Sequence, residues 1–363
     1  MLRAISCTIM RGGTSKGLYF DSQALPAQVA LRDRVLLAAM GSPDARQIDG
    51  LGGAHPLTSK VAIVGPPSRS DADVDYLFLQ VGVDTSEVSD QQNCGNLLAG
   101  VGPWAIEHGW VSALEGKTPV RIHMCNTASM AVATIETPNR KVQYEGAARI
   151  DGVPGTAAPI AIEFMDVTGS SCGALLPTGA RTDQIEGVAV TCIDNGMPVV
   201  LLRASDFGKS GRETPAELEG DAALTKRIES IRRALGPRMN LGDVARATVP
   251  KMCLVSIAEH GGTLSTRTFI PHRVHEAIGV LGALSVATAA VIPGTVAAAV
   301  AGSTIAAGAQ SIEVEHPTGS FRVDVDIDTS QAVPIVRRAA LLRTARKLMS
   351  GELYVPESLW TSA

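Results

Sequence analysis

The chain has 363 residues, of which 45% are apolar and 19% charged. This composition is too hydrophobic for a disordered protein and sufficient for one or two folded domains. The net charge of −4 and the aromatic fraction of 4% argue against a nucleic-acid-binding protein, which needs a basic surface and aromatic stacking platforms. Six scattered cysteines without a CxxC pair predict no structural zinc site, and free thiols fit a reducing cytoplasm.

The predicted elements alternate between short strands and a few helices. β-Rich runs bounded by Gly and Pro predict strands over residues 61–64, 74–81, 120–124, 130–135, 160–167 and 198–202. Helical patterns cover the segment from Asn96 to Gly109, Thr214–Leu235, and a segment from near His272 to Pro293. The Ala-rich stretch after Pro293 is expected to be a loop.

An uncharged segment, residues 277–312, is long enough to raise the question of a membrane span. Pro293-Gly294 interrupts it, and it has neither a Leu-rich run nor an aromatic or basic flank. We therefore expect a buried central helix and no membrane association. The N-terminus does not have the pattern of a signal peptide, so we expect a cytoplasmic protein.

Two segments of the chain share one pattern of elements. Residues 94–135 and 275–327 both predict a helix, a connection, a strand, a tight polar turn and a second strand. This repeat predicts two homologous halves that mix α and β structure, each wrapping strands around one apolar helix. The boundary between the halves is expected between residues 165 and 175.

The first candidate site segment is MRGGTSKG, residues 10–17. It does not have the GxxxxGK[ST] spacing of a phosphate loop. Its backbone N–H groups and the hydroxyls of Thr14 and Ser15 could still bind an anion. The alternative is an ordinary turn between strands with a solvated Lys16.

The second candidate is Lys60, which directly precedes the apolar strand 61–64. A lysine that is partly buried favours its neutral amine, which is the form that a general base needs. The alternative is a lysine at the strand edge that points into water.

The third candidate is Cys94, in the segment QQNCGN that opens the first helix. A helix N-terminus stabilises a thiolate, and its free N–H groups bind carboxylates. Asn93, Gly95 and Asn96 are therefore candidate ligands for an anion. The alternative is a buried, unreactive cysteine.

The fourth candidate is the segment 266–276, which contains Arg267, His272, Arg273 and His275. Its histidines match neither HExxH nor HxxEH, so we do not expect a metal site. We expect Arg267, His272 and Arg273 to bind carboxylates at the start of the second central helix.

Four motifs together resemble the PrpF-type isomerases of the diaminopimelate epimerase-like fold. They are MRGGTSKG (10–17), LTSK (57–60), QQNCGN (91–96) and RTARKLMSGELYVP (343–356). The resemblance extends from about residue 8 to residue 356. It implies an α+β fold of two pseudo-symmetric β-barrel-like halves, each around a central helix. The first half would comprise 1–168 and the returning segment 340–363, and the second half 169–339.

The resemblance also implies a reaction: a cofactor-independent 1,3-proton shift on a small unsaturated polycarboxylate, with Lys60 and Cys94 as the acid/base pair. Epimerases of this fold use one Cys from each half, but the second helix start has no Cys here, which argues against stereoinversion by two thiols. Thr14, Ser15, Asn93, Gly95, Asn96, Arg267, His272 and Arg273 would bind the substrate. A homo-oligomer is compatible with the family.

Three functions are compatible with these residues. The first is the isomerisation of 4-oxalomesaconate in the breakdown of aromatic acids. The second is the isomerisation of aconitate, methylaconitate or methylitaconate. The third is a non-catalytic accessory protein that binds a polycarboxylate, which would differ from the first two by the absence of turnover.

Overall fold

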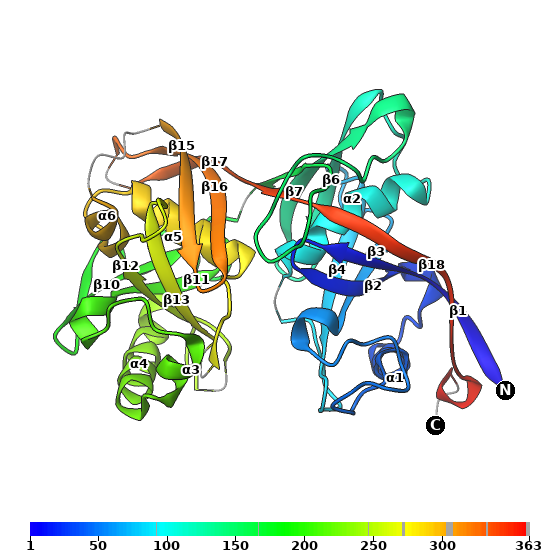
Figure 1. The fold of residues 1–363 in the computed structure, drawn as a ribbon, viewed down its shortest axis with the longest axis horizontal. Coiled ribbons are helices and arrows are strands. Elements are labelled where there is room, and N and C mark those ends of the chain that lie inside the picture. The colour runs from blue at the N-terminus through cyan, green and yellow to red at the C-terminus, as the bar shows by residue number, and fades with distance from the viewer. Residues whose placement is uncertain are drawn as a thin grey trace. The chain divides into compact units, whose positions relative to one another are not determined.

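The computed structural model describes residues 1–91, 93–165, 167–245, 247–270, 273–302, 308–331 and 333–360. The chain forms two compact units (Figure 1), unit 1 with residues 1–162 and 342–363 and unit 2 with residues 163–341. β8 (Ile160–Met165) crosses from the first unit to the second. Among the described residues, no helix is long and apolar enough to cross a membrane.

Unit 1 is one curved sheet with two helices. Its strands pair in the order β18-β1-β2-β3-β4-β6-β7, with β5 added on β4. The pairs β2–β3 and β4–β6 are parallel, and the other pairs are antiparallel. The bounds are β1 (Leu2–Gly12), β2 (Ser15–Asp21), α1 (Val29–Met40), β3 (Lys60–Gly65), β4 (Val74–Val81), β5 (Val88–Ser89), α2 (Gly95–Glu107), β6 (Gly116–Met124), β7 (Ser129–Thr137) and β18 (Ala345–Pro356).

α2 is the central helix of unit 1, and it contacts all seven strands of the main sheet. An apolar surface on every side lets the helix be enclosed in this way. Its glycines permit close approach: a Cβ at Gly100 would lie 2.4 Å from the hydroxyl oxygen of Tyr19 on β2. The other face of the sheet is covered by α1, whose Val35, Leu36 and Met40 share a buried cluster with Phe20.

Unit 2 repeats the pairing pattern of unit 1. Its order is β9-β10-β11-β12-β13-β15-β16-β17, with β14 added on β13 and with β11–β12 and β13–β15 parallel. This confirms the internal repeat predicted from the sequence. The bounds are β9 (Asp183–Ile185), β10 (Val188–Asp194), β11 (Pro198–Arg203), α3 (Pro215–Gly220), α4 (Ala222–Leu235), β12 (Lys251–Ser256), β13 (Leu264–Ile270), β14 (Arg273–Val274), α5 (Val280–Val291), α6 (Val296–Ala301), β15 (Gly308–His316), β16 (Gly319–Asp328) and β17 (Ile335–Arg343).

The central helix of unit 2 ends just before Pro293, as predicted, but starts later than predicted. α5 begins at Val280 rather than near His272, because Arg273 and Val274 pair with β13 as the short strand β14. All twelve residues of α5 are buried. The stretch after Pro293 is not only loop: Thr295 caps the helix α6 by accepting from the N–H of Ala298 at 3.1 Å.

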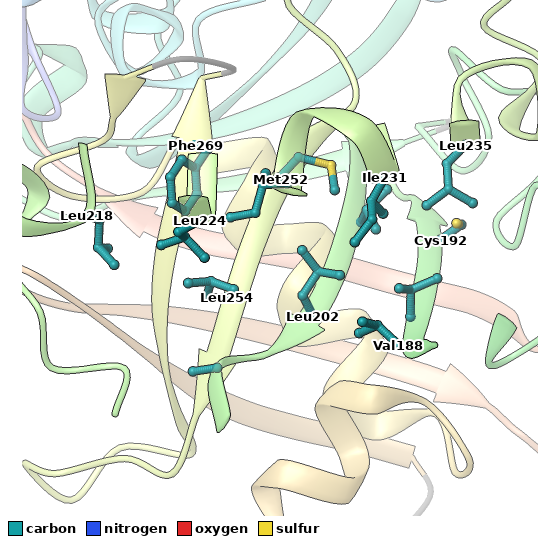
Figure 2. Close-up of a cluster of buried hydrophobic side chains, with 14 of the residues drawn as sticks. Val188, Cys192, Leu202, Leu218, Leu224, Ile231, Leu235, Met252, Leu254 and Phe269 are labelled. Atoms are coloured by element: carbon teal, nitrogen blue, oxygen red, sulfur yellow. The ribbon is translucent and has the colours of Figure 1, made fainter. Parts of the chain in front are cut away.

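The predicted helix over Thr214–Leu235 is two helices. Asp221 separates them, because its carboxylate accepts from the N–H of Leu224 at 2.9 Å and so starts α4. α4 packs on the outer face of the unit 2 sheet, where Leu224 and Ile231 lie in one cluster with Met252 and Phe269 (Figure 2). This face corresponds to the α1 side of unit 1.

Arg232 of α4 is a fully buried cation. Its guanidinium pairs with Glu229 through two contacts of 2.6 and 2.9 Å, and it donates to the carbonyl oxygens of Val244, Ala247 and Val249. These bonds attach the segment before β12 to α4. Removing the guanidinium would take a donor from the buried carbonyl of Val244 and from the partly buried carbonyls of Ala247 and Val249.

We predict that Arg232→Ala lowers the free energy of unfolding of unit 2 by about 3–5 kcal/mol, as expected for breaking a buried, hydrogen-bonded ion pair. Denaturant titration followed by circular dichroism measures this change. Arg233→Ala is the matched control, because Arg233 is the exposed neighbour on the same helix. Equal losses for the two variants would contradict the role of Arg232.

Candidate functional site

The β1–β2 turn is the centre of the unit 1 site. Gly12 pairs with Ser15, so Gly13 and Thr14 form a two-residue hairpin turn. Gly13 has a φ of +51°, which favours glycine. Arg11 holds the turn by donating to the carbonyl oxygens of Gly13 at 2.8 Å and Thr344 at 3.1 Å. The C-terminal segment therefore takes part in forming this site.

Asn96, in the first turn of α2, contacts this hairpin. Its Nδ2 donates to Thr14 Oγ1 at 3.1 Å. A Cβ at Gly13 would lie 2.2 Å from Asn96 Oδ1, and a Cβ at Gly12 would lie 2.4 Å from the Asn96 carbonyl oxygen. The two glycines thus let the hairpin approach the helix N-terminus closely.

Lys60 is the first residue of β3 and is 7% exposed. Its Nζ donates to Gln80 Oε1 at 2.6 Å and lies 5.0 Å from the centre of the Phe78 ring. Gln80 is oriented for this contact, because its Nε2 donates to the carbonyl oxygens of Ser59 and Pro56. The amide oxygen of Gln80 is therefore directed at the amine of Lys60.

Cys94 is the residue immediately before α2 and is partly exposed, so its thiol is not fully buried. Its carbonyl oxygen accepts from the hydroxyl of Tyr76 at 3.1 Å. Burial, followed by the charge of Cys94, raises the pKa of Tyr76 well above its ordinary value, so the hydroxyl remains a donor. Tyr76 and Phe78 lie two residues apart on β4, so both point to the same face. β4 thus contacts the Cys94 backbone through Tyr76 and the Lys60 amine through Phe78.

The β2–β3 register places Ser15 on the same face of the sheet as Lys60. Gly17 pairs with Lys60 in the parallel ladder, and a Cβ at Gly17 would lie 2.8 Å from the Leu97 side chain of α2. Ser15 is two residues before Gly17 and so points the same way. The structure therefore brings together six predicted residues: Thr14, Ser15, Lys60, Cys94, Gly95 and Asn96.

Several buried polar atoms at this site have no partner among the described residues. They are Ser15 Oγ, Asn93 Oδ1 and Asn96 Oδ1. Asn93 is held at its other end, where Nδ2 donates to Thr127 Oγ1. Because buried polar atoms in native proteins normally have a partner, and because the first N–H groups of α2 are also free of helical acceptors, these groups are available to a polar, anionic ligand.

In unit 2 the structure places Arg267 and Arg273 with residues of the α3 segment. Arg273 forms an ion pair with Glu219 at 3.0 Å, and Arg267 donates to the carbonyl oxygen of Glu213 at 2.7 Å. Arg267 is in β13 and Arg273 in β14, so neither lies at the start of α5. They line one pocket together with Thr214. His272 lies outside the described residues.

One group of side chains in unit 1 could in principle hold a metal. The donor atoms of Asp75, His123 and Cys125 lie within 4.8 Å of one another. However, His123 Nδ1 already contacts Asp75 at 3.0 Å and Ser68 at 3.2 Å. Burial, together with the Asp75 charge, raises the pKa of Cys125 to about 12, which disfavours the thiolate that a metal needs. That the protein uses no metal remains a prediction.

Sequence reasoning missed Arg11 and Gln80. Arg11 stands inside the MRGGTSKG motif, directly before two glycines. An arginine at this position could have indicated a side chain that donates to the carbonyl oxygens of the turn. Gln80 is the last polar residue in a strand of alternating burial, and only the β3–β4 register shows that it faces Lys60.

The family and the relatives of this chain agree with the geometry. The family model described as PrpF protein matches residues 2–356. A 4-oxalomesaconate tautomerase of Pseudomonas putida strain KT2440 is 57% identical over 98% of this chain and 97% of its own length. A (4E)-oxalomesaconate Delta-isomerase of Novosphingobium sp. strain KA1 is 56% identical over 96% of this chain and 97% of its own length.

Solved structures confirm the fold class. A methylitaconate-delta-isomerase superposes with a TM-score of 0.86 at 36% identity, covering 100% of this chain and 98% of the other. A hydroxyproline epimerase from Agrobacterium vitis has a TM-score of 0.57 at 13% identity, over 97% of this chain and 93% of the other, and shows the fold alone. The fold is α+β and diaminopimelate epimerase-like, as the resemblance implied. The chain belongs to the PrpF family.

We predict that Gly13→Ala destabilises the protein more than Gly109→Ala does. Gly109 also has a positive φ, +75°, but a Cβ there would meet no atom within 4 Å. The control therefore measures backbone strain alone, about 1–2 kcal/mol, whereas Gly13→Ala adds the displacement of Asn96. Thermal unfolding measures the stability, and the alkylation rate of Cys94, followed by peptide mass spectrometry, measures the displacement. Identical effects of the two variants would show that the contact with Asn96 is unimportant.

Proposed function

We propose that the protein isomerises 4-oxalomesaconate by a 1,3-proton shift, with Lys60 and Cys94 transferring the proton. The isomerase class follows from the PrpF family and from the names of the relatives. The observation that carries the proposal is the placement of Lys60: a buried amine, oriented by Gln80, on the strand face that also contacts Cys94.

The reaction requires a base and groups that stabilise the negative charge that develops on the substrate. The base takes a proton from a carbon next to a carbonyl or a conjugated acid, and the electron pair delocalises over the allyl system as an enolate. The proton then returns to the far carbon, so the double bond moves and no atom is lost or gained. Free N–H groups at the start of α2, with Ser15 and Asn96, supply hydrogen bonds to the developing charge.

Lys60 is our choice for the base. Its amine is oriented by Gln80 on the face of the sheet that also contacts Cys94. A polyanionic substrate favours the ammonium form of a nearby lysine and so opposes its action as a base. Cys94, at the N-terminus of α2, is then the group that returns the proton. The reverse assignment, in which the Cys94 thiolate starts the reaction, predicts a different pattern of mutant effects.

A second candidate reaction acts on aconitate, methylaconitate or methylitaconate. It is favoured by the TM-score of 0.86 to the methylitaconate-delta-isomerase. A panel of these acids and 4-oxalomesaconate, incubated in D₂O and followed by NMR, separates the candidates by the acid that exchanges fastest. A protein that only binds would be stabilised by an acid without incorporating deuterium.

We predict that Lys60→Met lowers kcat by about 10²–10⁴-fold, the usual contribution of a general base, with the fold intact. Cys94→Ser is expected to lower kcat less than Lys60→Met does if Cys94 only returns the proton. An equal loss of kcat would make Cys94 an obligate partner. Lys117→Met is the control, because Lys117 is an exposed strand lysine of the same unit. Near-wild-type turnover by Lys60→Met would refute the assignment.

We further predict that Gln80 positions Lys60 and sets the pH range of activity. Gln80→Leu removes the acceptor and should lower kcat at every pH while KM changes little. Gln80→Glu puts a carboxylate beside the amine and favours the ammonium, so kcat falls at neutral pH and recovers as the pH rises. Profiles of kcat against pH measure both effects. A wild-type kcat for Gln80→Leu, or a profile of wild-type shape for Gln80→Glu, would show that Gln80 does not position Lys60.

A further inference from the structure

The turn between β6 and β7, residues 125–128, lies beside both parts of the unit 1 site. Met124 pairs with Ser129, so four residues connect the two strands. The side chains of Asn126 and Thr127 form hydrogen bonds with other segments of unit 1. One of these segments carries the side chains around the Lys60 amine, and the other leads directly to the start of α2.

Asn126 closes a gap in the pairing of β4. β6 pairs with β4 as far as Tyr76, and the N–H of Cys125 donates to the carbonyl oxygen of Tyr76. β5 pairs with β4 only at Gln80 and the residue after it. Among the described residues, no strand pairs with Phe78 on this side of β4, so its N–H and carbonyl groups need another partner.

The side-chain amide of Asn126 supplies that partner in the manner of a strand backbone. Its Oδ1 accepts from the N–H of Phe78 at 2.9 Å, and its Nδ2 donates to the carbonyl oxygen of Phe78 at 2.9 Å. The same Nδ2 donates to the carbonyl oxygen of Asp90 at 2.7 Å. One amide group thus uses its acceptor and both of its donors, and it joins β4 to the segment that leads to Cys94.

The part of β4 that Asn126 holds carries three side chains of the site on one face. The Phe78 ring centre lies 5.0 Å from the Nζ of Lys60. Two residues later Gln80 accepts from this amine at 2.6 Å, and two residues earlier Tyr76 donates to the carbonyl oxygen of Cys94. The Phe78 backbone, at the centre of this group, therefore sets the position of the strand face that orients the amine.

The other segment that the turn holds ends at Cys94. Besides the bond to the carbonyl of Asp90, Thr127 Oγ1 accepts from Asn93 Nδ2 at 2.5 Å. Ser129 Oγ lies 2.8 Å from Thr127 Oγ1, within hydrogen-bond distance. The segment is therefore attached to the turn at two points immediately before the first turn of α2.

We propose that Asn126 is a positioning residue that fixes Lys60 and Cys94 relative to each other. This inference rests on the proposed function for the reaction that the two residues perform. The bonds of Asn126 are to the backbones of Phe78 and Asp90, so it acts on the reaction through these two segments. Proton transfer depends on the placement of its groups, and a displacement of about 1 Å can cost about 10²-fold in rate.

We predict that Asn126→Asp lowers kcat by about 10- to 100-fold at pH 7. The introduced carboxylate can still accept from the N–H of Phe78, but its second oxygen faces the carbonyl oxygens of Phe78 and Asp90 and repels them. KM should change by less than about threefold, because the loss affects groups that act in the transition state. Asn139→Asp is the matched control, at an exposed asparagine of the same unit, and should leave both constants unchanged.

Alkylation by iodoacetamide, followed by peptide mass spectrometry, tests Asn126 without turnover. Losing the bond to Asp90 frees the segment before Cys94, so Asn126→Asp should raise the alkylation rate of Cys94 by about 3- to 10-fold, as expected for one hydrogen bond. Cys7 of β1, a buried thiol of the same unit, should keep its wild-type rate. Equal increases at both thiols would indicate a general loosening of the unit and overturn the inference, as would a wild-type rate at Cys94.

Thr127→Val tests the second attachment and decides the matter if Asn126→Asp does not fold. It removes the Oγ1 that accepts from Asn93 and keeps the shape of the side chain. Cys94 should again be alkylated faster than in the wild type while Cys7 is not. KM should rise by about 3- to 10-fold, because Asn93 is a candidate ligand of the substrate. Wild-type alkylation and KM in this variant would contradict the role of the turn.

The two readouts separate this inference from the proposed function. If no acid of the panel is turned over but Asn126→Asp accelerates the alkylation of Cys94 alone, the proposed function fails and the attachment of the Cys94 segment by Asn126 stands. If Asn126→Asp turns over 4-oxalomesaconate at the wild-type rate, the inference fails and the proposed function stands.

Discussion

The structure depends on enclosing an apolar helix within a shell of strands, once in each unit. α2 contacts every strand of the main sheet of unit 1, and all of α5 is buried in unit 2. Such a helix has no polar face to present to water, so the strands must curve around it. This constraint explains the glycines of α2, since a side chain at Gly100 would collide with Tyr19. It also fixes where chemistry can occur, because the N–H groups at the start of the helix remain available.

Local patterns in the sequence were sufficient to predict several of the strands and the repeat, but they did not predict α1 or the start of α5. Residues 74–81 form β4 as predicted, because alternating burial is recorded in the residues themselves. The start of α5 was predicted too early because Arg273 and Val274 form a short strand that pairs with β13. No local pattern in the sequence indicates this pairing. The break at Asp221 was readable as an N-cap, but the charged helical pattern on both sides obscured it.

The candidate site was also predictable from the sequence only in part. Ser15, Lys60 and Cys94 stand in motifs whose residue types suggest proton transfer and anion binding, so the sequence could select them. The partner of Lys60 could not be selected, because Gln80 reaches it only through the β3–β4 register.

The two units show how a repeated fold can become chemically asymmetric. Their strands pair in the same pattern, so the backbone alone does not distinguish them. The residues before the central helices do: Cys94 precedes α2, whereas Gly279 precedes α5. In unit 1 the strand beside α2 also carries Lys60, whose amine donates to Gln80. A thiol together with an oriented amine is what the proposed proton transfer requires, so the repeat of the fold does not imply a repeat of the chemistry.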